Sequence, residues 1–366
     1  MNLLRIGQGA EYYRFIESVV EKHRQEIFNI SDSSLTIKKI VLSGKINAHP
    51  LSYGRLLTVR YDFNGNLREK IIYLKFRKNY KQVPDKYMEI YHRFSDEQQF
   101  LPKFYFHDKF PKTDESVIGM ELVDGKSLRS VFFSKMLMKK TTETGELFFK
   151  NGQIMRLFHD AQSPQGNRPV LDVLVYTKER LNSSKYFSET EKSKILNHLK
   201  NIEESIEPTL ALPLIHIHHD WSLRNIFVNR FNRIKMIDLD AYNRSLEWRW
   251  NDFAYFLINL ESQIKYAPLI READLNFLWE QFFSGYFSVG EDWKLTEKLL
   301  MRLIYLLKVY YWVIPYSLDE YYNHKLGKKY VKKLKESLVA GKVSFLYNFQ
   351  LGSNGIAKQP AAMSAE

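Results

Sequence analysis

The segment from residue 215 to residue 240 constrains the fold more than any other part of the chain. Asp220 and Asn225 lie five residues apart in a polar stretch that follows a short apolar alternation. Asp238 comes thirteen residues after Asn225 and closes the apolar run 234–237. Apolar runs of this length are typical of buried strands, and polar residues at their ends are typical of loops. The pattern predicts two loops that present two carboxylates and an amide.

These three side chains suit the transfer of a phosphoryl group. Negative charge spreads over the phosphate oxygens in such a transfer, so a protein must hold Mg²⁺ and orient the attacking hydroxyl. Asn225 and Asp238 offer the hard oxygen ligands that Mg²⁺ prefers, and Asp220 is the candidate base for the hydroxyl proton. Asp240, two residues later, is a further candidate for the metal or for holding the loop. The segment therefore indicates a kinase that uses ATP and Mg²⁺.

The motifs of this segment resemble those of a known family. His218-His219-Asp220, Asn225 and the run 237–240 are similar to the catalytic and metal loops of the aminoglycoside phosphotransferase and choline kinase-like family. The flanking residues follow in the same order. Residues 120–128 resemble the lobe linker, and Asp252-Phe253-Ala254 resembles the family's Asp-Leu-Ala. Two departures, Ser222 for the usual His and Glu247-Trp248-Arg249 for Gly-Asp-Pro, lie on the substrate side.

The resemblance implies an α+β, bilobal, protein-kinase-like fold. It implies a first lobe over residues 1–121, with a helix and a small antiparallel sheet, and a larger, mostly helical lobe over residues 122–345. Residues 346–366 are expected to form a mobile tail. The length of 366 residues agrees with two lobes, because it exceeds what one hydrophobic core usually holds.

Local patterns predict the elements of both lobes. Runs of β-branched and aromatic residues predict strands, and Asn64-Gly65 between two of them predicts a tight hairpin. Apolar residues at helical spacing predict helices, the first of them over residues 12–28. The other predicted elements are strands over 37–46, 53–61, 70–76, 103–107 and 117–123, and helices over 84–94, 145–159, 188–206, 252–264 and 275–287.

Lys75, in the third predicted strand, is the candidate ligand of the ATP phosphates. A lysine that faces a cleft from a half-buried strand needs an anion, although the side chain could instead point to solvent. Its expected helix partner is Glu89, and Lys45 is the next candidate for the phosphates. The resemblance implies that adenine bonds backbone groups between Glu121 and Val123.

The charge balance indicates an anionic acceptor. A formal net charge of +12 suits the polycationic and quaternary-ammonium substrates of this family poorly. Trp248, with Tyr242 and Trp250, is predicted to stack on a sugar, and Arg244 and Arg249 beside them to bind a phosphate or carboxylate. Arg224 is also placed on the acceptor side. We expect a hydroxyl of an anionic sugar or glycolipid as acceptor, with an aminoglycoside or choline-type substrate as the alternative. A buried aromatic cluster is the competing interpretation of the tryptophans.

The remaining composition bears on partners and location. The lysines of residues 325–335 suit either an anionic membrane surface or the solvated face of a helix, and no nucleic-acid-binding module accompanies them. Residues 1–10 lack the apolar stretch of a signal peptide, and the apolar stretch 303–316 is interrupted by Lys308 and Pro315, as in a buried helix. We expect a cytoplasmic protein, with peripheral membrane contact left open. The absence of cysteine excludes disulfides and thiol catalysis.

Two alternatives to the kinase interpretation remain. His216, His218 and His219 with Asp220 form a possible zinc-ligand pattern, although a structural role for His218 in holding the loop fits better. A kinase-like binding module without activity is the other alternative. Such a module is expected to have lost one of its catalytic residues, whereas Asp220 and both candidate metal ligands are present.

Overall fold

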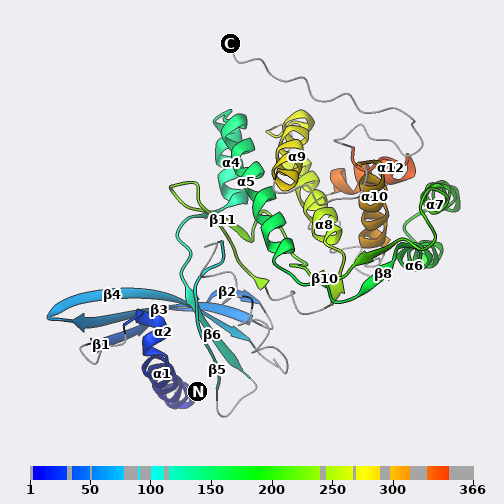
Figure 1. The fold of residues 1–366 in the computed structure, drawn as a ribbon. Coiled ribbons are helices and arrows are strands. Elements are labelled where there is room, and N and C mark those ends of the chain that lie inside the picture. The colour runs from blue at the N-terminus through cyan, green and yellow to red at the C-terminus, as the bar shows by residue number, and fades with distance from the viewer. Residues whose placement is uncertain are drawn as a thin grey trace. The chain divides into compact units, whose positions relative to one another are not determined.

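The structure, a computed structural model, describes residues 3–30, 35–49, 52–77, 90, 100–110, 115–239, 245–266, 269–288, 297–313 and 328–345. The chain divides into two compact units. The first unit comprises residues 1–125 and 235–237, and the second comprises residues 126–234 and 238–366. A sheet-rich first unit and a helix-rich second unit confirm the predicted α+β fold (Figure 1).

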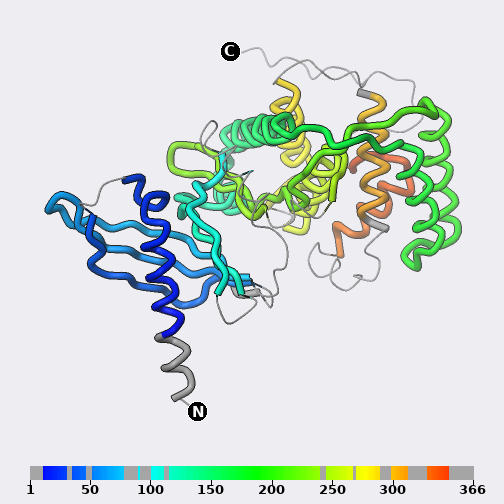
Figure 2. Tube along the Cα trace, turned by 60° about the horizontal axis from the view of Figure 1, so that its bottom comes forward, coloured from blue at the N-terminus to red at the C-terminus, as the bar shows by residue number. Residues whose placement is uncertain are grey.

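An antiparallel sheet of six strands forms most of the first unit. Five strands follow the order β1-β3-β4-β6-β5, and β2 pairs with the start of β3. Figure 2 shows α1 crossing the sheet. The elements are α1 (Leu3–Lys22), α2 (Arg24–Phe28), β1 (Leu35–Leu42), β2 (Ile46–His49), β3 (Ser52–Phe63), β4 (Asn66–Arg77), β5 (Phe104–Lys109) and β6 (Ser116–Glu121).

The core of the first unit lies between α1 and the sheet. Apolar residues recur at helical spacing along α1, so Ile16, Val19 and Val20 all face inward and are buried. Alternate residues of β3 and β4 meet them, because successive side chains of a strand point to opposite faces. The predicted first helix is confirmed, but it is interrupted at His23, where α1 gives way to α2. The buried strand residues include Leu57, Val59, Ile72 and Leu74.

The hairpin between β3 and β4 forms where the sequence predicts it. Asn64 and Gly65 have φ angles of 54° and 78°, and Phe63 pairs with Asn66 across the turn. Asn and Gly tolerate this left-handed backbone, and a turn with both central residues there matches the twist of paired strands. The Asp62 carboxylate accepts a hydrogen bond from the Gly65 N–H at 2.9 Å. The turn therefore fixes the register along the whole length of β3 and β4.

Helices make up most of the second unit. The helices are α4 (Leu128–Leu137), α5 (Thr141–Asp160), α6 (Val170–Ser183), α7 (Glu189–Glu203), α8 (Trp250–Glu261), the 3₁₀ helix η2 (Ser262–Tyr266), α9 (Glu272–Phe287), α10 (Glu297–Val313) and α12 (Lys328–Val339). The short strands that follow β6 in the chain are β7 (Lys126–Ser127), β8 (Asn167–Pro169), β9 (Ala211–Pro213), β10 (Ile215–His216), β11 (Ile226–Val228), β12 (Ile234–Met236) and β13 (Leu246–Glu247).

Most of the predicted helices are confirmed. The predictions over 145–159, 188–206 and 275–287 correspond to α5, α7 and α9, and the prediction over 252–264 corresponds to α8 followed by η2. Ser188 begins α7 with a capping box, in which its hydroxyl and the Glu191 carboxylate each accept a backbone N–H. The predicted tail lies outside the described residues, as does the predicted helix over 84–94 apart from Ile90.

The described part of the apolar stretch over 303–316 lies in α10, which ends at Val313, and residues 303–309 are buried as predicted. Lys308 is fully buried, and its Nζ donates to both carboxylate oxygens of Glu261 at 2.9 Å and to the Val343 carbonyl at 2.7 Å. Tyr330 also donates to Glu261, at 2.9 Å. These contacts satisfy the buried charges and join α8, α10 and α12. Among the described helices, none is both long and apolar enough to cross a membrane.

Two lysines of α12 face carboxylates of neighbouring helices. Lys333 Nζ lies 2.6 Å from Glu272 Oε1, and Lys335 Nζ lies 2.8 Å from Glu191 Oε2. Tyr330 and Leu334 of the same helix are buried, whereas Lys328, Lys329 and Lys332 are exposed. The pattern agrees with the solvated helix face, one of the two interpretations of the basic run.

Helices α5 and α9 pack with their backbones close together because each carries a glycine at the contact. A Cβ atom on Gly152 would lie 2.0 Å from the Phe282 carbonyl oxygen, and one on Gly285 would lie 1.9 Å from the Phe149 carbonyl oxygen. Both distances are far below van der Waals contact. The close approach matters for the site described below, since α5 and α9 carry His159 and Tyr286.

We predict that Gly285→Ala destabilises the protein by about 1–3 kcal/mol, although alanine is the better helix former. The added methyl group would force α5 and α9 apart, and this cost exceeds the gain in helix propensity. Gly44→Ala is the control, because nothing lies within 4 Å of a Cβ at that position. Urea unfolding would measure both variants. Equal stability of Gly285→Ala and the wild type would contradict the close packing.

Candidate active site

One buried carboxylate holds the start of the loop that runs from His218 to Asn225. Asp252, in the first turn of α8, is fully buried and accepts the backbone N–H groups of His218 and His219, each at 2.9 Å. His219 has a φ of 62°, a strained conformation for this residue that the two hydrogen bonds hold in place. Asp252, the first residue of the motif that resembles the family's Asp-Leu-Ala, thus has a structural role: it holds the backbone of the loop.

A second layer of side chains orients Asp252. The His159 Nε2 lies 3.1 Å from Asp252 Oδ2, and the His159 Nδ1 lies 3.0 Å from the hydroxyl of Tyr286. All three side chains are buried. Burial raises the pKa of Tyr286, so this residue remains a donor. Burial lowers the pKa of His159, and the neutral tautomer that satisfies both contacts accepts at Nδ1 and donates at Nε2. Although burial opposes it, the hydrogen bond from His159 lowers the pKa of Asp252.

The middle of the loop is fixed by three further contacts. The buried Trp221 donates from its indole nitrogen to Asn151 Oδ1 at 3.1 Å. The N–H of Leu223 donates to Asn259 Oδ1 at 3.1 Å, and its carbonyl accepts the backbone N–H of Arg129 at 2.8 Å. Helices α5, α8 and α4 therefore each hold one point of the loop.

The Asp220 carboxylate is held at both oxygens. Oδ1 accepts the hydroxyl of Tyr255 at 2.9 Å, and Oδ2 accepts the side-chain Nδ2 of Asn225 at 2.9 Å. The same Nδ2 also donates to the Asp220 carbonyl at 3.0 Å. Its amide oxygen must then point away from Asp220. Below the carboxylate, His218 Nδ1 accepts the Asp220 N–H at 3.2 Å. This contact supports the predicted structural role of His218 in holding the loop.

Asp238 follows β12 and has a φ of 65°. A left-handed backbone is uncommon for a residue other than glycine, and such strained residues cluster at functional sites. Asp240 lies outside the described residues. Across the described part of the chain, no three His, Asp or Glu side chains are grouped to hold a metal ion. The zinc pattern of His216, His218 and His219 is therefore not formed, whereas a Mg²⁺ ion needs only one or two protein carboxylates.

A cavity of about 210 Å³ opens beside Asp220. Three cationic side chains line it, and Asp220 is the one carboxylate among its described lining residues. The backbone of Arg129 at the start of α4 and Asn259 on α8 tie this cavity to the loop. The lining residues are Arg129, Asp220, Ser222, Arg224, Asn225, Tyr255, Asn259, Ser262, Gln263 and Lys265.

The first unit carries the residues predicted to contact the nucleotide. Lys75 is partly buried in the central strand β4, opposite Gly54 on β3 and Ile118 on β6. Lys45 is exposed, with Nζ 4.1 Å from the centroid of the Tyr53 ring. Glu89 lies outside the described residues. The roles of these residues toward a nucleotide stay predictions.

The predicted adenine contact at Glu121 is restricted by the structure. Its backbone N–H donates to the Lys103 carbonyl at 2.7 Å. Lys235 Nζ donates to both oxygens of its carboxylate, to Oε1 at 2.6 Å and to Oε2 at 2.5 Å. A backbone N–H that is already used in the protein cannot also donate to adenine. The other backbone contacts of adenine within residues 121–123 stay a prediction.

The structure contradicts the predicted acceptor surface after the metal loop. Trp248 and Trp250 are only 1% and 2% exposed, so neither ring can stack on a sugar. The competing interpretation, a buried aromatic cluster, is correct. Arg249 Nη1 forms an ion pair with Asp160 at 2.8 Å, and its side chain is 12% exposed. It therefore fixes α8 to the end of α5 instead of facing a ligand. Tyr242 and Arg244 lie outside the described residues.

Arg224 does line the cavity, as expected for the acceptor side, but several of its neighbours were not predicted. Tyr255 and Asn259 lie three and seven residues after Asp252, a spacing that puts all three on one face of a helix. These polar residues in an otherwise apolar helix are a signal that could have found them. Arg129 and Lys265 come from other elements, and no local pattern marks them.

The low pKa of His159 predicts a pH dependence of stability. An unfolded histidine binds a proton below about pH 6.5, whereas the buried His159 resists protonation, so stability falls as the pH drops below that value. Asp252 stays ionised there because its pKa is below its ordinary value. We expect His159→Gln to lower the free energy of unfolding at pH 7.5. Between pH 7.5 and 5.5, this free energy should fall less in His159→Gln than in the wild type. Urea midpoints measure both, and equal pH slopes would contradict the assignment.

No protein-family model matches the chain, and no curated protein matches its sequence. Similar solved structures include amicoumacin kinase hAmiN in complex with AMP-PNP, Ca²⁺ and Ami, at 14% identity and a TM-score of 0.49, covering 90% of this chain and 95% of that one. A protein from Ralstonia eutropha assigned as an aminoglycoside phosphotransferase has 13% identity and a TM-score of 0.49, covering 88% and 97%. Aminoglycoside phosphotransferase APH(3'')-Id from Streptomyces rimosus has 13% identity and a TM-score of 0.36, covering 69% and 89%. Similarity of this strength carries no conclusion about activity, which must come from the site residues.

Proposed function

We propose that the protein is an ATP-dependent phosphotransferase that moves the γ-phosphoryl group of ATP to a hydroxyl of a small molecule. The observation that carries this proposal is the Asp220 carboxylate, which is held at both oxygens and lines a cavity of about 210 Å³. A cavity of this size suits a small acceptor or one end of a larger one.

Asp220 has the properties of a base for the acceptor hydroxyl. Each of its oxygens accepts one hydrogen bond in the protein, and each carboxylate oxygen has capacity for a second. In the reaction, the acceptor oxygen bonds to the γ-phosphorus while the bond from this phosphorus to the bridging oxygen breaks. ADP leaves, and the hydroxyl proton passes to Asp220. The hydrogen bonds from Tyr255 and Asn225 orient the carboxylate for this step.

The site also contains residues that fit Mg²⁺. Because Asn225 directs its Nδ2 toward Asp220, its Oδ1 is the atom that a cation would bind. The Asp238 carboxylate is the second ligand in this proposal. Bound Mg²⁺ would offset negative charge on the nucleotide phosphates. One carboxylate and one amide leave coordination positions for water and phosphate oxygens, which is the usual arrangement for this ion.

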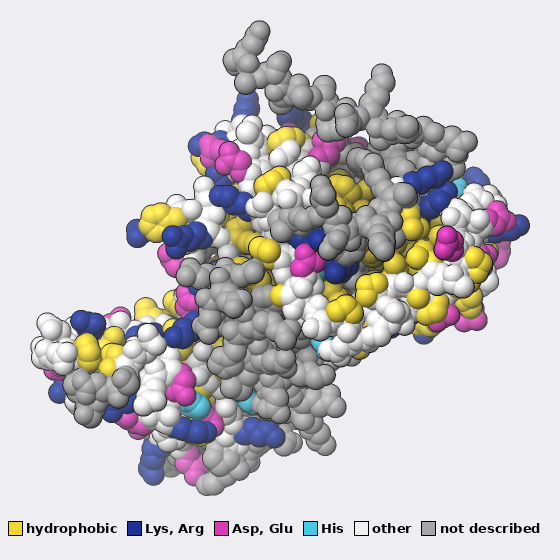
Figure 3. All heavy atoms as spheres, in the orientation of Figure 1, with side chains coloured by type: hydrophobic (Ala, Val, Ile, Leu, Met, Phe, Trp, Pro, Cys, Tyr) yellow, Lys and Arg dark blue, Asp and Glu magenta, His cyan; other side chains and the backbone are white. Residues whose placement is uncertain are grey.

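The lining of the cavity supports an anionic acceptor. Arg129, Arg224 and Lys265 line the cavity in which we propose that the acceptor binds, and they would repel a cationic aminoglycoside or choline. The net charge of +12 agrees, although on the face in Figure 3 the Lys and Arg side chains are interspersed with Asp and Glu. The three cationic side chains that line the cavity therefore support an anionic acceptor more strongly than the net charge does. An anionic sugar or glycolipid remains our proposed acceptor class.

We predict that Asp220→Ala lowers kcat by about 100- to 10,000-fold, the range for loss of a general base. Binding of Mg²⁺-ATP should stay close to that of the wild type, because Asp220 contacts the acceptor. Asp238→Ala should weaken Mg²⁺-ATP binding as well. Glu146→Ala, on an exposed part of α5, is the control. Calorimetry with Mg²⁺-AMP-PNP and a mass assay over anionic, neutral and cationic alcohols measure these effects. Wild-type turnover in Asp220→Ala would refute the assignment of the base.

We predict that Lys75→Ala costs about 2–4 kcal/mol of transition-state stabilisation, the range for one electrostatic contact in a water-poor site. Lys75→Arg should not restore activity, because a planar fork cannot replace a compact ammonium group. Lys39→Ala removes the same charge from an exposed position on β1 and serves as the control. The ratio kcat/KM for ATP is the measurement. Normal kinetics in Lys75→Ala would transfer the phosphate role to another residue, with Lys45 tested next.

A further inference from the structure

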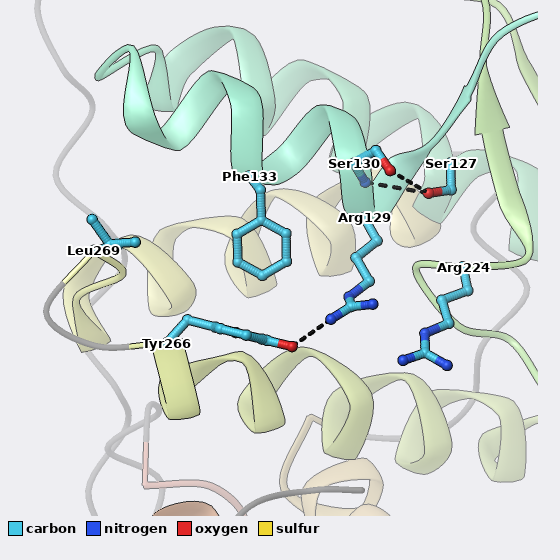
Figure 4. A pocket seen from close by; sticks show the side chains of 7 residues that line it. All are labelled: Ser127, Arg129, Ser130, Phe133, Arg224, Tyr266 and Leu269. Atoms are coloured by element: carbon cyan, nitrogen blue, oxygen red, sulfur yellow. Dashed lines mark hydrogen bonds between the residues drawn. The ribbon is translucent and has the colours of Figure 1, made fainter.

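A second and larger cavity, of about 530 Å³, shares two arginines with the cavity at Asp220. Arg129 and Arg224 line both, so the two cavities are neighbours. Figure 4 shows the two side chains extending in the same direction, with Phe133 and Tyr266 beside Arg129. Its lining residues are Ser127, Arg129, Ser130, Phe133, Arg224, Tyr266 and Leu269.

Arg129 is held in a defined position. Its Nη2 donates to the hydroxyl of Tyr266, and its guanidinium carbon lies 5.6 and 5.7 Å from the ring centroids of Phe133 and Tyr266. These contacts use one of the five N–H donors of an arginine side chain and leave the others for a ligand. The backbone N–H of Arg129 binds the Leu223 carbonyl, which ties the same residue to the loop of Asp220.

Neither arginine is neutralised within the described part of the chain. No Asp or Glu side chain there forms an ion pair with Arg129 or Arg224, whereas Arg168 and Arg249 each do have such a partner. Two like charges that line one cavity repel each other, and a bound anion removes this repulsion. Forked guanidinium groups match the oxygens of a phosphate in geometry and in charge.

We propose that the acceptor already carries a phosphate monoester, which binds between Arg129 and Arg224. This inference rests on the proposed phosphotransfer at Asp220. The acceptor presents its hydroxyl to Asp220 in the smaller cavity, and its phosphate lies at the two arginines. The apolar wall of the larger cavity, formed by Phe133, Tyr266 and Leu269, takes a ring face or a short hydrocarbon segment of the same molecule. Tyr266 acts as a positioning residue for Arg129.

Binding of inorganic phosphate to the full chain, saturated with Mg²⁺-AMP-PNP, tests the site directly. The nucleotide occupies its own phosphate ligands, so the phosphate signal reports the second site. We expect Arg129→Gln and Arg224→Gln each to weaken phosphate binding about tenfold or more, since each removes charge-assisted hydrogen bonds. Arg230→Gln is the matched control, because Arg230 is exposed and lines neither cavity. Tyr266→Phe should weaken phosphate binding less than Arg129→Gln.

Several results would overturn the inference. Absence of phosphate binding to the wild type, or equal binding to all variants, overturns the inference. It is also overturned if Arg129→Gln and Arg224→Gln weaken Mg²⁺-AMP-PNP instead, because the arginines would then serve the donor. Kinetics with sugar phosphates and their unphosphorylated parents separate this inference from the proposed function. Transfer to the parents alone refutes the phosphate site and retains the kinase, whereas arginine-dependent phosphate binding without any transfer retains the anion site and refutes the kinase.

Discussion

The candidate site depends on the hydrogen bonds that Asp252 accepts from the backbone of His218 and His219. A buried carboxylate is costly unless its charge is matched, and here two backbone N–H groups and a ring N–H of His159 supply the match. The same bonds hold His219 in a left-handed conformation that it would not adopt alone. These bonds therefore fix the two residues that precede Asp220, whose carboxylate contacts Tyr255 and Asn225.

Helix α8 transmits this constraint from the core to the cavity. Its first turn carries Asp252, its middle carries Tyr255 and Asn259, and its last residue is Glu261, which is buried against Lys308. An ion pair of this kind adds little net stability compared with an apolar pair, but removing one partner leaves an unmatched buried charge. The pair therefore holds the end of α8 against α10, while the helix itself fixes the spacing of the groups that touch the loop.

The sequence predicted the site best where residues act close to their position in the chain. Asp220 and Asn225 were predicted to share a loop, and the structure places them there with a 2.9 Å contact between their side chains. The acceptor side was predicted poorly for the same reason. Trp248 and Arg249 follow the metal loop in sequence, yet the ring is buried and the guanidinium is paired with Asp160. Arg129, which lines the cavity, comes from the start of α4, and only tertiary packing brings it there.

The double use of Arg129 has a consequence for how such a site can evolve. Its backbone N–H supports the loop of Asp220, while its side chain lines the cavity in which we propose that the acceptor binds. Any residue other than proline supplies the same backbone group. Selection can therefore replace the side chain at this position, and with it the preferred charge of the acceptor, while the support of the reacting group stays intact. A substitution at this single position can thus change substrate specificity without removing the backbone contact that supports the loop of Asp220.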